Sequence, residues 1–92
     1  MNDVRAHLTI RGVVQGVGFR YFAYRWAEKL GLNGWVRNSW DDAVETEVEG
    51  ERSAVEEYIE QMKIGPRSGQ VSKVDVEYKL YEGTYRKFDI TR

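Results

Sequence analysis

Two kinds of amphipathic segment follow one another along this chain, and their order restricts the fold more than any other feature of the sequence. Ala6, Leu8 and Ile10 alternate with polar residues, which predicts a strand with one buried face. The segment from Phe19 to Leu30 instead has apolar residues at spacings of three and four. This pattern predicts a helix that ends at Gly31. Its expected apolar stripe comprises Phe22, Ala23, Trp26, Ala27 and Leu30.

The same two patterns recur in the rest of the chain. Residues 33–38 and 44–50 are predicted to form two antiparallel strands joined by the polar turn 39–42. Ser53 and Glu56 have the spacing of a capping box, which predicts a second helix to about Lys63. Gly65-Pro66 would stop that helix. A further strand is expected at 74–80 and a short last one at 88–90.

These segments give the order βαββαβ plus a C-terminal strand, which indicates an α+β, ferredoxin-like two-layer sandwich. Each strand has one polar face, so we expect an antiparallel sheet with both helices on one face and solvent on the other. Right-handed crossovers would place the first and third strands at its centre. Ninety-two residues are enough for one core, so residues 1–92 are expected to form a single domain.

Composition excludes several kinds of chemistry. The chain has no cysteine and only one histidine, so thiol chemistry and a metal site built on imidazole are not expected. Fourteen Lys and Arg against fifteen Asp and Glu leave a net charge of −1, which provides no general attraction for nucleic acid. No apolar run approaches the ~18 residues of a membrane span, and the first residues lack a signal-peptide core. We therefore expect a soluble, cytoplasmic protein, most simply a monomer.

The loop before the first helix has the composition of an anion-binding site. It reads Gln15, Gly16, Val17, Gly18, Phe19 and Arg20. Glycines let backbone N–H groups converge, the helix N-terminus adds partial positive charge, and Arg20 offers a bidentate fork. A phosphate would fit these groups. On loop composition alone, the glycines could equally serve only to turn the chain, with Arg20 as a solvated surface residue.

Three segments together carry a closer resemblance. Residues 11–20, 34–38 and 44–50 are similar to the signatures of the acylphosphatase family, and the likeness covers essentially the whole chain. It implies a hydrolase for the anhydride between a carboxylate and phosphate, with no cofactor. Residues 15–20 would hold the phosphate, Arg20 and Asn38 would be the catalytic residues, and Asn38 would hold the attacking water.

The mechanism implied by this resemblance is direct in-line attack of that water, without a covalent intermediate or a metal. An acyl phosphate is an activated anhydride, so positioning and charge stabilisation suffice. The amide of Asn38 is no base near neutral pH, so the water's proton would pass to a phosphate oxygen of the substrate. The sequence departs from the family at Asp42, where the hairpin often has glycine. The acyl group of the natural substrate stays open.

Two other functions are compatible with the fold pattern. A non-catalytic sensor of a phosphorylated metabolite could use the same loop, but it would not need an amide such as that of Asn38. RNA binding on the open sheet face is disfavoured, because the third strand carries Glu45, Glu47 and Glu49 there.

Several other side chains are assigned no chemistry. The three glutamates alternate as a solvated face does. His7 is expected on the same solvated face. Trp35 and Trp40 are interpreted as packing or partial cover.

Overall fold

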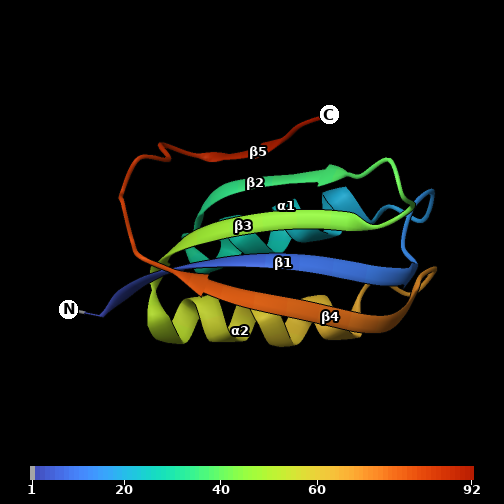
Figure 1. The fold of residues 1–92 in the computed structure, drawn as a ribbon, viewed down its shortest axis with the longest axis horizontal. Coiled ribbons are helices and arrows are strands. Elements are labelled where there is room, and N and C mark those ends of the chain that lie inside the picture. The colour runs from blue at the N-terminus through green and yellow to red at the C-terminus, as the bar shows by residue number, and fades with distance from the viewer. Residues whose placement is uncertain (1) are drawn as a thin grey trace.

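The computed structural model describes residues 2–92, and that part of the chain forms seven helices and strands (Figure 1). They are β1 (Asp3–Val13), α1 (Phe19–Leu30), β2 (Asn33–Asn38), β3 (Val44–Glu51), α2 (Arg52–Ile64), β4 (Gln70–Lys79) and β5 (Phe88–Ile90). The order confirms the predicted α+β, ferredoxin-like sandwich. No helix within residues 2–92 is both long and apolar enough to cross a membrane.

The sheet has the strand order β4-β1-β3-β2-β5, so β1 and β3 lie inside it as predicted. β1 pairs antiparallel with β3 and β4, and β2 pairs antiparallel with β3. The expectation of a wholly antiparallel sheet is wrong at one edge, because β5 pairs parallel to β2. The reason lies in the chain path. Residues 80–87, the β4–β5 connection, cross from one edge of the sheet to the other, and β5 then runs in the direction of β2 (Figure 1).

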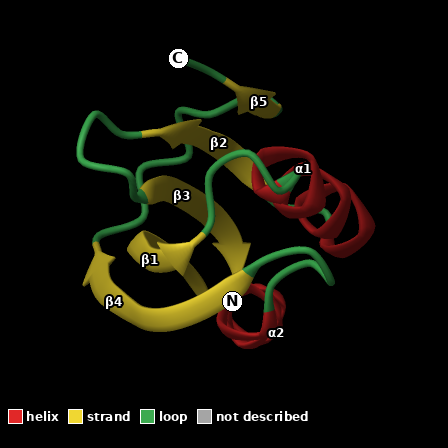
Figure 2. Cartoon of the chain, turned by 90° about the vertical axis from the view of Figure 1, so that its right-hand side faces the viewer, coloured by secondary structure: helices red, strands yellow, loops and turns green. Residues whose placement is uncertain are grey.

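Both helices cover one face of the sheet, as Figure 2 shows in end view. Their buried side chains belong to one hydrophobic core with Ala6, Leu8 and Ile10 of β1, which are fully buried. In α2 the predicted stripe is confirmed, with Val55, Tyr58, Ile59 and Met62 all buried. In α1 the buried residues are Phe19, Ala23 and Ala27, whereas the predicted Phe22, Trp26 and Leu30 are only partly covered at the edge of the core.

The start of α2 differs from the predicted capping box. The N-cap is Glu51, whose carboxylate accepts hydrogen bonds from the backbone N–H groups of Ser53 (3.1 Å) and Ala54 (3.4 Å). Because β3 runs into α2 without a linker, its last residue takes the capping position. A carboxylate there also complements the positive end of the helix dipole.

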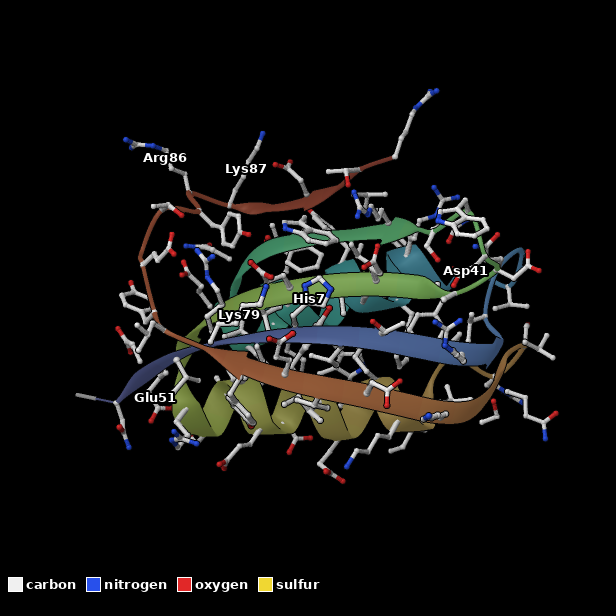
Figure 3. All side chains as sticks on the ribbon, viewed as in Figure 1. His7, Asp41, Glu51, Lys79, Arg86 and Lys87 are labelled. Carbon is white, nitrogen blue, oxygen red and sulfur yellow. The ribbon has the colours of Figure 1, made fainter. Side chains whose placement is uncertain are left out.

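The carboxylates of β3 are a second correction. Glu47 and Glu49 were expected on a solvated face, but they are 4% and 3% exposed. Arg5 Nε donates to Glu49 at 2.8 Å, and Arg5 Nη1 lies 3.3 Å from Glu47. His7 also faces this cluster, with Nδ1 2.8 Å from Glu47 Oε1 and Nε2 3.2 Å from Glu45 Oε2. Figure 3 shows His7 and Lys79 on this face, which lies opposite the helices.

The β4–β5 connection completes the burial of these carboxylates. The backbone N–H groups of Glu82 and Gly83 donate to Glu49 at 2.9 and 3.2 Å. Tyr85 donates its hydroxyl hydrogen to Glu47 at 2.6 Å and accepts a hydrogen bond from Trp35 Nε1 at 3.0 Å. Trp35 thus packs as predicted. A buried charge is tolerated only when it is paired and hydrogen-bonded, and the connection supplies part of that pairing.

We expect the folded protein to lose stability in acid through this cluster. Burial alone would raise the pKa of Glu49, but the N–H groups of the β4–β5 connection and the Arg5 guanidinium outweigh it and hold that pKa below its ordinary value. The pKa of Glu47 is lowered in the same way, with burial outweighed by Tyr85, His7, Lys79 and Arg5. A carboxyl with a lowered pKa stabilises the fold above its unfolded pKa of about 4.3. That contribution is lost as pH falls through the folded pKa.

Glu49→Gln tests this expectation. The variant should be about 2 kcal/mol less stable at pH 7, because it leaves Arg5 short of a buried partner. Its stability should also decline less steeply below about pH 4. Urea denaturation at a series of pH values measures both, with Glu77→Gln on the exposed part of β4 as the matched control. Equal stability curves for the two variants would contradict the role given to Glu49.

Candidate functional site

The β1–α1 loop takes the conformation that its glycines allow. Gly16 and Gly18 have φ angles of 75° and 79°, in the left-handed region that other residues rarely adopt. A Cβ on either residue would meet open space, so backbone conformation and not crowding requires glycine here. Open space beside a glycine also leaves its peptide accessible to a ligand.

The helix that follows has an uncapped N-terminus. Gly18 is the N-cap of α1 and has no side chain to offer, and the first turn contains no acidic residue. The N–H groups of that first turn have no intrahelical partner, and the helix dipole places about half a positive charge beside them. This end of α1 can therefore receive an oxyanion.

A pocket of about 290 Å³ opens at this point, between the loop, the start of α1 and the ends of β2 and β5. It is lined by Val14, Gly16, Gly18, Phe19, Arg20, Tyr21, Asn38 and Ile90. Five of the predicted site residues thus come together, namely Gly16, Gly18, Phe19, Arg20 and Asn38. The sequence did not indicate Val14, Tyr21 or Ile90.

Gln15 and Val17 belong to the predicted site but do not line the pocket. The Gln15 amide donates to the backbone carbonyls of Ser39 and Ala43 at 2.8 and 2.9 Å. Its side chain therefore ties the loop to the β2–β3 hairpin, and only its backbone remains to meet a ligand. Val17 packs against the edge of the hydrophobic core.

Arg20 and Asn38 reach the pocket from different elements. Arg20 is an exposed residue of the first turn of α1, and its guanidinium forms no ion pair within residues 2–92. Asn38 ends β2, where its backbone pairs with Val44 of β3. The hairpin that follows Asn38 is the one held by Gln15. The loop and Asn38 are therefore fixed relative to each other through Gln15.

The turn after Asn38 contains a strained residue at Asp42, the position where the sequence departs from the family. Its φ is 70°, the only positive φ among the non-glycine residues in the described part of the chain. Ser39 N–H donates to the Ala43 carbonyl at 2.9 Å and closes the turn. Trp40, expected to pack, is 97% exposed at the tip because nothing in the turn lies against it.

Asp42→Gly should make the protein slightly more stable. Glycine removes the cost of the positive φ but gains freedom in the unfolded chain, so the net gain is about 0.5 kcal/mol. We expect kcat to change little, because Arg20 and Asn38 keep their own anchoring. Urea denaturation and a rate assay on one preparation decide the matter. A clear loss of stability would mean that the Asp42 side chain stabilises the turn.

This α+β sandwich brings an uncapped helix N-terminus, an exposed arginine and an amide to one pocket, which are the features of a small phosphoryl-binding protein. A sequence model of one family, acylphosphatase, matches residues 6–90. The chain belongs to the acylphosphatase family.

Individual relatives agree with this assignment over more than nine-tenths of their length. The chain is 47% identical over 90 residues to an acylphosphatase of Bifidobacterium longum, which covers 97% of this chain and 93% of that protein. It is 51% identical over 91 residues to an acylphosphatase of Acaryochloris marina, covering 99% and 97%. The crystal structure of acylphosphatase from Bacillus subtilis superposes with a TM-score of 0.93 at 34% identity, covering 97% of this chain and 99% of that one.

Proposed function

We propose that this protein hydrolyses small acyl phosphates to a carboxylate and inorganic phosphate by direct in-line attack of an oriented water. Membership of the acylphosphatase family supports the activity. The observation that carries the mechanism is the shared pocket, in which Gly16, Gly18 and Arg20 lie together with Asn38. The protein acts as a monomer on a small molecule, with no nucleic acid or membrane partner.

The phosphoryl group binds at the β1–α1 loop. Backbone N–H groups of residues 15–20 donate to its oxygens, and the helix dipole adds attraction for the anion. Arg20 supplies a planar, charged fork that neutralises the oxygens as negative charge builds up on them. Because the Arg20 guanidinium forms no ion pair with any of the described residues 2–92, no bond to them must break before it binds the phosphoryl group.

Asn38 holds the attacking water in line with the bond that breaks. A new bond forms between the water oxygen and phosphorus, while the bond from phosphorus to the acyl oxygen breaks and the carboxylate leaves with its electron pair. The amide of Asn38 orients the water but accepts no proton. The water's proton passes to a phosphate oxygen of the substrate.

This mechanism needs no covalent nucleophile, because a carboxylate is already a good leaving group. It also gives no task to a metal ion. Among residues 2–92, no group of three or more acidic or histidine side chains is arranged to hold one. Arg20 and the loop N–H groups do the charge stabilisation.

We therefore expect phosphate release from benzoyl phosphate to be equally fast with and without excess EDTA. Release is followed as inorganic phosphate, corrected for the spontaneous hydrolysis of the substrate. A loss of activity in EDTA that added metal restores would overturn the metal-free mechanism. No phosphate release under either condition would overturn the proposed function itself.

A further inference from the structure

The pocket is lined by two exposed side chains, Tyr21 and Ile90, that the proposed mechanism does not use. The other lining residues already have a role. Val14 and Phe19 are buried beneath the pocket, and Gly16, Gly18, Arg20 and Asn38 bind the phosphate and the water. Tyr21 and Ile90 remain, and they are large, apolar and exposed, at 59% and 44%. The acyl group of a bound substrate extends out of the phosphate site and must contact a part of the protein surface beside it.

In-line geometry determines on which side of the phosphate the acyl group lies. A water held by Asn38 attacks phosphorus from that side, so the acyl oxygen lies on the opposite side. A second hollow, which contains Trp40, Arg37 and Arg92, adjoins Asn38 and Ser39. Asn38 lines both that hollow and the pocket, so Trp40 is the other exposed ring that an acyl group could meet.

The Tyr21 ring packs against a neighbouring ring. It stacks on Tyr24 with ring centroids 6.2 Å apart and an interplanar angle of 20°. The Tyr24 ring in turn lies beside the ring of Phe88, with their centroids 6.2 Å apart. Phe88 belongs to β5 and precedes Ile90 by two residues. An aromatic row thus joins the first turns of α1 to β5. A tyrosine side chain has only two rotatable bonds, so it loses little conformational entropy when a ligand packs on it.

The charge of this rim is as informative as its shape. Arg20 is the only cationic side chain among the described residues that line the pocket. In the proposed mechanism its guanidinium pairs with the phosphate and is not available to a second anionic group. Arg25 lies 5.9 Å from the Tyr21 ring but belongs to a separate hollow on α1 with Phe22, Trp26 and Lys29. An acyl group with a second negative charge would therefore find no partner in the pocket.

Resting on the proposed function, we propose that Tyr21 and Ile90 form the binding surface for the acyl group and select uncharged, apolar or aromatic acyl phosphates. The volume of about 290 Å³ is near the lower end of small-molecule sites, which suits a small acyl group. The surface sets specificity by packing against the acyl group. It takes no part in binding the phosphate.

The experiment compares kcat/KM for three substrates, namely benzoyl phosphate, acetyl phosphate and 4-carboxybenzoyl phosphate. We expect the wild type to prefer benzoyl over both others. Tyr21→Ala should lower the ratio of kcat/KM for benzoyl to that for acetyl phosphate about tenfold, and Ile90→Ala should lower it several-fold. A substitution that slows the hydrolysis of both substrates equally leaves this ratio of kcat/KM values unchanged. Tyr21→Phe should keep the ratio, because the ring and not the hydroxyl makes the contact.

Tyr81→Ala is the matched control, since Tyr81 is also an exposed tyrosine but lies in the β4–β5 connection. It should leave the ratio unchanged. Inhibition by inorganic phosphate should be the same in all variants.

Three results would overturn the proposal. The first is an unchanged ratio in both Tyr21→Ala and Ile90→Ala. The second is a ratio that responds to Trp40→Ala instead, which would place the acyl group on the other side of Asn38. The third is a preference for the 4-carboxybenzoyl substrate, which would mean that a cation such as Arg25 takes part. A wild type that hydrolyses none of the three substrates would instead contradict the proposed function.

Discussion

Arg20→Lys is expected to lower kcat/KM for benzoyl phosphate by roughly a hundredfold or more, ~3 kcal/mol of transition-state stabilisation. Lysine keeps the positive charge but cannot supply the planar fork that contacts two phosphoryl oxygens at once. Arg20 is also the only cation in the described lining of the pocket, so no neighbour can replace it. Steady-state hydrolysis measures the effect.

Arg86→Lys is the matched control for this change. Arg86 is an exposed residue of the β4–β5 connection, and Figure 3 shows its side chain pointing away from the sheet. Its replacement should leave kcat/KM within twofold of the wild type. A near-normal rate for Arg20→Lys would remove Arg20 from the site.

Asn38→Ala should abolish turnover while leaving the binding of inorganic phosphate largely intact. The amide acts on the water and the loop acts on the anion, so the two functions should separate. Asn38 lies at the end of β2, with its backbone paired to Val44, so the substitution should not disturb the sheet. Phosphate binding is measured by titration or by the rise in Tm that it causes.

A parallel loss of rate and of phosphate affinity in Asn38→Ala would contradict this division of labour. Asn38 would then be a ligand of the anion or a structural residue. Gln15→Ala is a useful comparison, because its amide ties the loop to the hairpin after Asn38. That variant should weaken phosphate binding and turnover together.

The parts of the fold that the sequence predicts are those set by local periodicity. The alternation in β1 and the three-four spacing in α2 each reflect one buried face, so element order and strand positions follow from them. The pairing of β5 does not follow. Phe88–Ile90 is too short to show a direction, and its parallel partner β2 lies some fifty residues earlier in the chain.

The buried carboxylates show a different limit. Glu47 and Glu49 have the alternation of a solvated face, and nothing within β3 shows that another segment covers them. Their burial depends on Arg5 and on backbone N–H groups of the β4–β5 connection, more than thirty residues away. Only the tertiary structure places these partners together.

Some residues of the candidate site can be predicted from the sequence and others cannot. Gly16, Gly18 and Arg20 lie within one short segment of the chain, and the resemblance to the family implies the role of Asn38. Tyr21 directly follows Arg20 on the first turn of α1, so its sequence position alone places it near the phosphate loop. Ile90 gave no signal, because it reaches the pocket only through the parallel pairing with Val36.

Hydrolysis of benzoyl phosphate in ¹⁸O-labelled water, with excess EDTA present, tests the central claim most directly. If an oriented water attacks phosphorus, each turnover places one ¹⁸O in inorganic phosphate and none in benzoate. Mass spectrometry of both products measures this, after subtraction of the spontaneous reaction. Label in benzoate would show attack at the carbonyl carbon and would contradict the mechanism assigned to Arg20 and Asn38.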